Sequence, residues 1–269
     1  MSHPKRHYYV INLPKCQDRK ERITKRLKHH GVYDQTTFIE AVDKESGLLD
    51  WFQDGLTYSF ISTRPEHACF LSHLKAIRTF ALDPNVDEAI ILEDDAMLHN
   101  NFKERLEYVL ARRGEAPLLM LFFLAAAWDG VQKAPSDITG TEIPSPPHLF
   151  TIQEKIYGAV GYWMTKDYAW QCLSRLDRPL RYFGELFVTS ELITRLSGGY
   201  FVSPPLIVEE AVYSTLRQGN DLNVHRDYCA AFGYENYSAA DEGDIKAIWK
   251  PLGYNPLNEQ PKEEGASKL

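Results

Sequence analysis

Hydrophobic and polar positions follow two alternating patterns along this chain. Short runs of apolar, β-branched and aromatic residues predict buried strands. They cover residues 8–13, 37–42, 89–92, 118–124 and 157–164. The segments between them carry apolar residues three or four positions apart, which is typical of a helix with one buried face. These helices are expected at residues 18–30, 66–82, 102–113 and 166–176. Strand followed by helix, several times over, predicts an α/β fold with a mainly parallel central sheet flanked by helices.

Acidic residues follow two of the predicted strands. Asp43 comes after the second strand, and Glu93, Asp94 and Asp95 directly follow residues 89–92. Ligands of such sheets bind beyond the carboxyl ends of the strands. On an extended chain alternate side chains share a face, so Glu93 and Asp95 are expected to point together. Their hard oxygens suit Mg²⁺ or Mn²⁺. The alternative is a solvated acidic turn.

Charge narrows the class of partner. The formal net charge of -7 argues against a nucleic-acid-binding protein, which usually carries a basic surplus. Residues 15–30, however, hold seven Lys or Arg against Asp18 and Glu21. This basic stretch could meet a phosphate-bearing ligand or an anionic membrane, or it could be the solvated face of a helix.

The cysteines and the apolar runs bear on the compartment. The four cysteines are far apart and form no CxxC pair, so their spacing predicts neither a zinc site nor a disulfide framework, and a reducing compartment is expected. The N-terminus lacks the apolar region of a secretory signal. The longest apolar run, residues 117–128, is too short to span a bilayer. We expect a cytoplasmic protein without a transmembrane segment, with peripheral membrane contact left open.

Several segments together resemble one known family, glycosyltransferase family 25, which includes lipopolysaccharide sugar transferases and collagen galactosyltransferases. The matching segments are VINLPKCQDRKERI, FIEAVD, ACFLSHLKAI, AIILEDDAML, YGAVGYWMTKDYAWQCL and SPPLIVEEAVYSTL. The most specific part is SHL followed about twenty residues later by LEDD, and the resemblance covers roughly residues 7–216.

The resemblance implies a domain organisation and a reaction class. Residues 1–220 would form a single nucleotide-sugar-binding domain of the GT-A type, with a donor half at about 1–124 and an acceptor half at about 125–220. Residues 221–269 would be a C-terminal extension, and its polar, charged end is expected to be disordered. The implied activity is that of an inverting glycosyltransferase of glycan or lipopolysaccharide biosynthesis. It would transfer a hexose, galactose or glucose, from a UDP-sugar to a hydroxyl of a glycan or glycosylated protein.

The resemblance also implies roles for individual residues. Glu93 and Asp95 would hold the cation, usually Mn²⁺ and alternatively Mg²⁺. The donor nucleotide sugar would be bound by Asn12, Arg19, Ala41, Val42, Asp43, His73 and Asp94. For Arg19 the alternative is a helix-surface arginine, for Asp43 a helix cap, and for His73 a buried core residue.

Inversion in one displacement needs a carboxylate base to take the proton from the acceptor hydroxyl. The segment FGELFVTSEL resembles the one that carries this base, so Glu185 is the first candidate and Glu191 the second. Glutamate stands there where the family tends to have aspartate. Two other functions stay open: a metal-dependent phosphohydrolase, and a non-catalytic nucleotide-sugar- or partner-binding module on a decayed transferase fold. The oligomeric state is not predicted.

Overall fold

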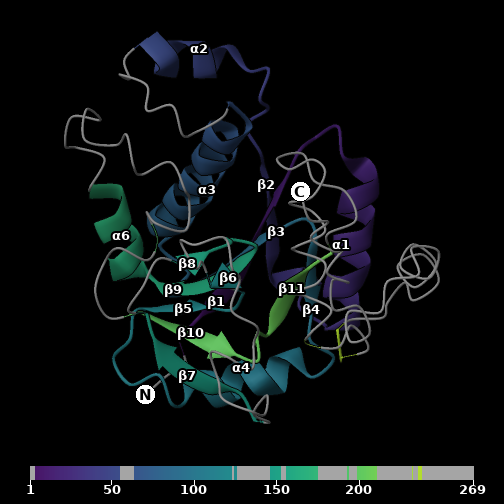
Figure 1. Ribbon diagram of the computed structural model, residues 1–269, viewed down its shortest axis with the longest axis vertical. Coiled ribbons are helices and arrows are strands. Elements are labelled where there is room, and N and C mark those ends of the chain that lie inside the picture. The colour runs from purple at the N-terminus through teal and green to yellow at the C-terminus, as the bar shows by residue number, and fades with distance from the viewer. Residues whose placement is uncertain are drawn as a thin grey trace, which may run out of the picture.

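The chain folds around one seven-stranded sheet with helices on both faces (Figure 1). The computed structural model describes residues 4–54, 64–122, 124–125, 146–152, 156–174, 193, 199–210, 232 and 236–237. The strand order across the sheet is β2-β1-β3-β9-β5-β10-β7. In chain order these strands are β1 (Arg6–Asn12), β2 (Thr36–Glu40), β3 (Glu88–Glu93), β5 (Leu118–Met120), β7 (His148–Thr151), β9 (Gly161–Thr165) and β10 (Gly199–Ser203).

The sheet is mixed, with parallel strands at its centre and at one edge. Strands β2, β1 and β3 run parallel, and so do β5 and β10. Strand β9 lies antiparallel between β3 and β5, and β7 is antiparallel at the other edge. The predicted α/β fold with parallel strands flanked by helices is confirmed. An apolar run does not encode strand direction, so the two antiparallel strands were not foreseen.

Two short antiparallel pairs lie outside this sheet. Strand β4 (Ala96–Leu98) pairs with β11 (Ile207–Glu209), and β6 (Leu124–Ala125) pairs with β8 (Ile156–Tyr157). The β4–β11 pair joins the segment just after β3 to a segment more than a hundred positions later in the chain. It therefore fixes the chain directly behind the acidic triplet.

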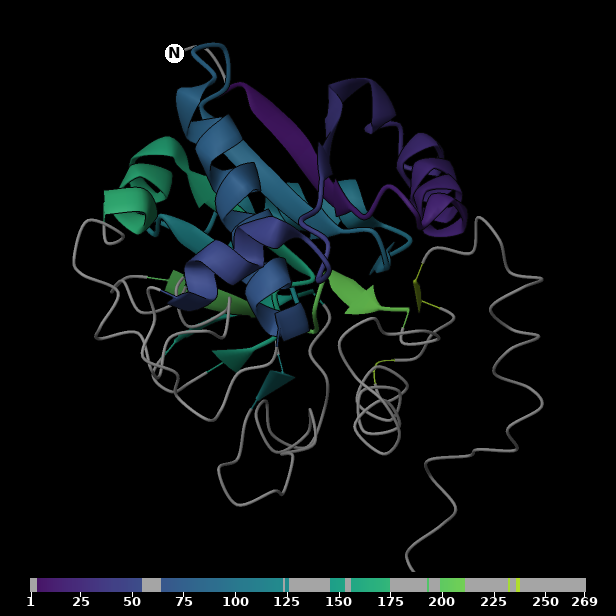
Figure 2. The ribbon, with the colours of Figure 1, turned by 90° about the horizontal axis from the view of Figure 1, so that it is seen from above.

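The helices divide between the two faces of the sheet (Figure 2). Strand residues alternate in direction, so Tyr8 and Val10 pack with α1 and α4, whereas Tyr9 and Ile11 pack with α3 and α6. All four residues are buried, as expected for a central strand covered on both faces. The helices are α1 (Gln17–His29), α2 (Gly47–Asp54), α3 (Arg64–Leu82), α4 (Phe102–Leu110) and α6 (Lys166–Ser174), with a 3₁₀ turn η1 (Tyr33–Gln35).

The predicted helices form at the expected places, with ends shifted by a few residues. Helix α4 ends at Leu110, three residues before the predicted end, and α2 was not predicted. No described helix is both long enough and apolar enough to cross a bilayer.

Residues of the expected C-terminal extension also reach the core. Phe232 and Tyr237 are buried with the α1 and α4 side chains, and the Tyr237 hydroxyl donates to the Pro205 carbonyl at 2.7 Å. The residues after Tyr237, which include the predicted disordered tail, lie outside the described residues. The boundary at residue 221 stays a prediction.

The three parallel strands β2, β1 and β3 end at nearly the same level. Asn12 is in register with Glu40, and Ile11 is in register with Glu93. The loops that follow these strands therefore meet at one edge of the sheet, where the amino-terminal half of α3 also lies. This edge is where an α/β fold presents its ligand site.

Candidate functional site

A cavity of about 290 Å³ opens at this edge of the sheet. Its walls come from the end of β1 and the loop after it, the loop between β2 and α2, helix α3, and the end of β3. The predicted donor-binding residues found on its walls are Arg19, Ala41, Val42, Asp43, His73 and Asp94, and the predicted metal ligand Glu93 lies there too. Segments up to 83 positions apart in the chain, from Ile11 to Asp94, thus meet at this cavity.

The acidic triplet is arranged differently from the expectation. The chain turns at Asp94 and Asp95, between the end of β3 and the start of β4. The premise that Glu93 and Asp95 share one face of an extended chain is therefore wrong. Glu93 and Asp94 line the cavity, whereas Asp95 lies behind its wall, 7% exposed.

Arg19 holds the two aspartates of this turn. Its Nη2 donates to Asp95 Oδ2 at 2.7 Å and also pairs with Asp94 Oδ1. Asn12 Nδ2 donates to the other Asp94 oxygen at 2.7 Å and to the Cys16 carbonyl at 3.2 Å. Asn12 therefore stands one step behind the cavity and positions Asp94.

Burial and opposite charge act against each other in this cluster. Burial lowers the pKa of the Arg19 guanidinium, but the carboxylates of Asp95, Asp94 and Glu93 outweigh it, and the pKa is raised. Burial raises the pKa of Asp94, opposed by Arg19 and by the hydrogen bond from Asn12. Burial likewise raises the pKa of Asp95, opposed by Arg19 and reinforced by the neighbouring Glu209. A cation entering this site would be stabilised by the same carboxylates.

The turn fits a divalent cation that also binds a phosphate ligand. Mg²⁺ and Mn²⁺ commonly take one or two protein carboxylates, with water and phosphate oxygens completing the shell. Glu93 and Asp94 offer two such groups to the cavity. Asp95 Oδ1 is buried without a hydrogen-bond partner in the described part of the chain, while its Oδ2 is held by Arg19. Ligation by Asp95 stays a prediction, and it would engage this orphaned oxygen.

The loop after β2 is fixed to helix α3. The Ser72 hydroxyl accepts from the Val42 N–H at 2.8 Å and donates to the Ala68 carbonyl at 2.7 Å. The Ala41 N–H donates to the Asn12 carbonyl at 2.9 Å. Both N–H groups are therefore engaged within the protein. If the backbone of Ala41 and Val42 binds a nucleotide base, it does so through carbonyl oxygens.

Asp43 stands at the mouth of the cavity. Its Oδ2 pairs with Lys15 Nζ at 2.6 Å, and its Oδ1 accepts from the Glu45 N–H at 3.0 Å. Helix α2 begins only at Gly47, so Asp43 supports a turn in the loop and does not cap that helix. The hydrogen bond from Lys15 lowers the pKa of Asp43, which keeps the carboxylate charged beside the cavity.

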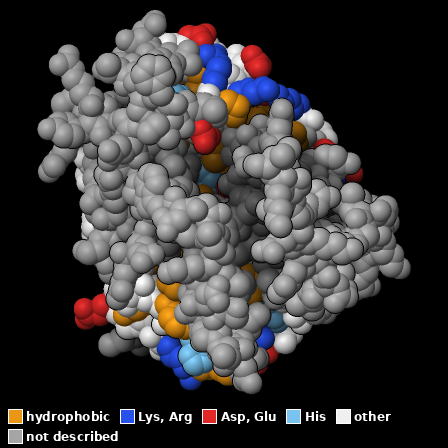
Figure 3. All heavy atoms as spheres, viewed as in Figure 1, with side chains coloured by type: hydrophobic (Ala, Val, Ile, Leu, Met, Phe, Trp, Pro, Cys, Tyr) orange, Lys and Arg blue, Asp and Glu red, His pale blue; other side chains and the backbone are white. Residues whose placement is uncertain are grey.

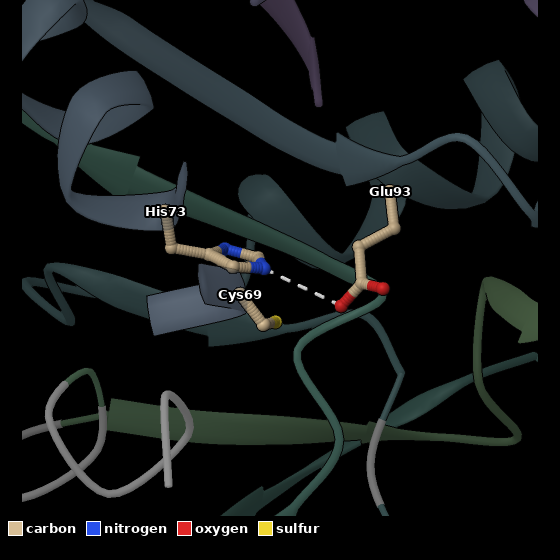
Figure 4. A group of neighbouring side chains, drawn as sticks. All are labelled: Cys69, His73 and Glu93. Carbon is tan, nitrogen blue, oxygen red and sulfur yellow. Dashed lines mark hydrogen bonds and ion pairs between the residues drawn. The ribbon is translucent and has the colours of Figure 1, made fainter. Parts of the chain in front are cut away.

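His73 is fully buried and connects helix α3 to the end of β3. Its Nδ1 lies 3.0 Å from the Tyr162 hydroxyl, and its Nε2 lies 3.3 Å from Glu93 Oε1. Cys69, one turn earlier on α3, points to the same place (Figure 4). Both His73 and Cys69 line the cavity. The part of His73 in donor binding stays a prediction.

The charged residues Lys15 and Lys44 and the thiol of Cys69 also line the cavity and were not predicted from the sequence. Lys15 and Lys44 add positive charge to that of Arg19, which suits a diphosphate. Figure 3 shows Lys and Arg side chains near the top of one face, above a hollow. The signal for Lys15 was the basic excess after β1. The signal for Cys69 was its spacing of four from His73, which puts both side chains on one helix face.

The two candidates for the catalytic base, Glu185 and Glu191, lie outside the described residues. Their assignment stays a prediction from the resemblance of the FGELFVTSEL segment.

Comparisons with known proteins point to one family. The family model described as "Glycosyltransferase family 25 (LPS biosynthesis protein)" matches residues 5–180. A protein of Acanthamoeba polyphaga mimivirus named as a glycosyltransferase, R655, is 30% identical over 129 residues, covering 46% of this chain and 39% of the viral protein. Human procollagen galactosyltransferase 2 is 26% identical over 121 residues, covering 41% of this chain and 19% of the human protein.

The chain thus matches well under half the length of both relatives. Among solved structures, one described as mannose-1-phosphate geranyltransferase from Thermus thermophilus superposes with a TM-score of 0.31. It is 11% identical, over 74% of this chain and 73% of that chain, a likeness too weak to add to the assignment.

Proposed function

Because the chain belongs to glycosyltransferase family 25, we propose that it is an inverting, metal-dependent hexosyltransferase. The donor is a UDP-sugar, with galactose the first choice and glucose the second. The acceptor is a hydroxyl of a glycan or of a glycosylated protein, in glycan or lipopolysaccharide biosynthesis. The GT-A type of fold implied by the family belongs to the same proposal.

One observation supports this function above the others. One cavity at the carboxyl ends of parallel strands is lined by the Ala41–Val42 segment, by basic side chains and by three carboxylates, those of Asp43, Glu93 and Asp94. A nucleoside diphosphate sugar has matching parts: a base and ribose, a diphosphate, and a phosphate-bound cation. Cavities at such an edge commonly bind nucleotides.

In this proposal, different residues bind different parts of the donor. Ala41, Val42 and Asp43 receive the base and ribose, the first two through carbonyl oxygens and Asp43 through its charged carboxylate. Lys15 and Lys44 meet the diphosphate. Binding there requires the bridge between Lys15 and Asp43 to open or to be shared with the ligand.

The cation is held by Glu93 and Asp94, with Asp95 joining through its Oδ1, the oxygen that Arg19 does not hold. Arg19 and Asn12 position the turn, and His73 positions Glu93 through its Nε2. Mn²⁺ or Mg²⁺, when bound, supplies charge neutralisation of the departing diphosphate. Glu185, or alternatively Glu191, takes the proton from the acceptor hydroxyl as the new glycosidic bond forms.

Donor-induced stabilisation tests the proposal directly. The full chain is heated with Mn²⁺ and each of a panel of UDP-sugars, and UDP release is measured in parallel. We expect one or two UDP-sugars to raise the melting temperature in the presence of metal, with slow UDP release. Asp43→Asn, which keeps the side-chain shape but removes the charge, should reduce this shift. Glu45→Gln, a matched loop variant whose side chain is not among those lining the cavity, should not.

The competing functions predict other results. No thermal shift with any nucleotide sugar, with or without metal, would reject the transferase. Phosphate release from a simple phosphoester would favour the phosphohydrolase. Stabilisation without UDP release across a broad acceptor panel would favour the non-catalytic module.

A further inference from the structure

Three potential metal ligands of different chemistry converge at the floor of the cavity. The ligand atoms of Cys69, His73 and Glu93 all lie within 4.8 Å of one another. Cys69 and His73 are one turn apart on α3, and Glu93 ends β3, so two elements of the rigid core supply the group (Figure 4). No other such group occurs among the described residues.

The distances between the ligand atoms are close to those around a bound zinc ion. Zinc ligands sit about 2.0 to 2.3 Å from the metal in a tetrahedron, so they lie about 3.4 to 3.6 Å from one another. His73 Nε2 and Glu93 Oε1 are already 3.3 Å apart. The Cys69 sulfur lies within 4.8 Å of both atoms and would supply the third corner. The cavity leaves the fourth corner for water or a ligand oxygen.

The types of ligand atom distinguish this site from the proposed cation site at Glu93 and Asp94. Thiolate and imidazole favour borderline and soft metals such as Zn²⁺, whereas carboxylates with water and phosphate oxygens favour Mg²⁺ and Mn²⁺. Glu93 belongs to both sets. A zinc ion on Cys69 and His73 would therefore withdraw Glu93 from the cation that binds the diphosphate.

A buried partner is in place to orient the imidazole. Tyr162 is fully buried, and its hydroxyl lies 3.0 Å from His73 Nδ1. A phenol oxygen accepts hydrogen bonds as well as donating one, so Tyr162 can accept from Nδ1–H. If Nδ1–H donates to the Tyr162 oxygen, the Nε2 lone pair faces Glu93 and Cys69. Metal-bound histidines are commonly held by an outer hydrogen bond of this kind.

We propose that Cys69, His73 and Glu93 form a zinc site, and that zinc bound there inhibits the enzyme. As the Zn–S bond forms, the Cys69 thiol proton passes to solvent and Glu93 binds as the carboxylate. The His73 proton passes through solvent from Nε2 to Nδ1, where the Tyr162 oxygen accepts it. The site itself does not depend on the proposed function. The inhibition rests on it, because it requires that Glu93 serve the donor cation.

Direct binding is the first test. The full chain, without a metal-binding tag, competes with a colorimetric chelator for Zn²⁺, and Co²⁺ is then bound in place of zinc to report sulfur ligation. We expect a thiolate-to-cobalt absorption band in the wild type that is absent in Cys69→Ser, with zinc affinity at least about tenfold weaker. Tyr162→Phe should weaken zinc about tenfold but keep the band.

The matched control is Cys16→Ser, because Cys16 is also partly buried and is not one of the three ligands. It should bind zinc like the wild type. Equal zinc affinity in Cys69→Ser and Cys16→Ser, or a cobalt complex without the thiolate band, would overturn the site. Circular dichroism of each variant shows whether it has folded.

Inhibition is the second test. With Mn²⁺ in excess, Zn²⁺ should suppress the UDP-sugar-induced thermal shift, and Cys69→Ser should need at least about tenfold more zinc for the same suppression. Suppression at the same zinc concentration in both proteins would overturn the inhibitory role. A thiolate band together with no thermal shift from any UDP-sugar would reject the proposed function and leave the zinc site standing.

Discussion

Arg19 determines, at the scale of single residues, how the two aspartates after β3 can be used. Its guanidinium pairs with both carboxylates, yet only Asp94 also faces the cavity. We predict that Asp94→Asn weakens Mn²⁺-dependent UDP-sugar binding about tenfold or more, which is about 1.4 kcal/mol or more. Asp95→Asn should chiefly lower the free energy of unfolding, by about 1–3 kcal/mol, since Arg19 loses a buried, charged partner. Urea denaturation and donor titration measure the two effects.

The same pair of variants tests the original assignment of Asp95 as a metal ligand. If Asp95→Asn abolishes metal-dependent donor binding at unchanged stability, Asp95 ligates the cation through the Oδ1 that Arg19 does not hold. Asp18→Asn is the control, because Asp18 is exposed and pairs with Arg22 on the outer surface of α1. It should change neither quantity, since surface ion pairs contribute little to stability.

At the scale of elements, helix α3 holds the loop between β2 and α2 in place, and Ser72 is the residue that binds this loop. Ser72→Ala would leave the Val42 N–H without its acceptor. We predict a loss of about 1–3 kcal/mol in the free energy of unfolding. We also predict weaker UDP-sugar binding, with KM affected more than kcat, because the loop positions the nucleoside rather than the reacting atoms.

A second hydroxyl on the same helix provides the control for Ser72. Thr79 donates to the carbonyl four residues earlier, as Ser72 does, but it is exposed. Thr79→Ala should cost less than about 0.5 kcal/mol and leave UDP-sugar binding unchanged. Equal losses in the two variants would show that the hydroxyl matters for the helix alone and not for the loop.

The elements also show how far the sequence alone could lead. The periodic segments identified α1, α3, α4 and α6, because each buries one face against the sheet. The turn at Asp94 and Asp95 was not predicted, because an apolar run does not show where its strand ends. Strand β4, which follows the turn, pairs with β11, and only tertiary folding brings β11 near. The joining of Cys69 and His73 to Glu93 depends likewise on where α3 crosses the sheet.

At the scale of the whole molecule, the two faces of the sheet have different roles. The α3 and α6 face supports the cavity, whereas two buried histidines, His30 after α1 and His99 after β4, lie with the α1 and α4 layer. Burial, the largest cause, and nearby positive groups together lower the pKa of each to about 4. The positive groups are His29 and Lys103 for His30, and Arg105 and His30 for His99. The free energy of unfolding at acid pH should therefore depend on these two histidines of the α1 and α4 layer, away from the cavity.

The sign of this effect follows from linkage. Both histidines stay neutral in the folded state down to about pH 4 but gain a proton near their ordinary pKa of 6.5 when unfolded. The unfolded state binds more protons between these values, so their contribution to stability is complete above about pH 6.5 and is lost as the pH falls toward 4. Burial raises the pKa of Asp94 and Asp95, which acts in the opposite direction. A comparison with a histidine variant is therefore needed to isolate the two histidines.

His99→Asn supplies that comparison. His99 Nδ1 accepts a hydrogen bond from the Asn101 N–H at 3.0 Å, and the asparagine oxygen can take its place without titrating. We predict that the free energy of unfolding, measured in urea at pH 7, 6 and 5, falls less steeply in His99→Asn than in the wild type. The carboxylates are the same in both proteins, so their contribution cancels in the difference. Identical slopes would mean that His99 is protonated in the folded state, which its role as acceptor at Nδ1 does not allow.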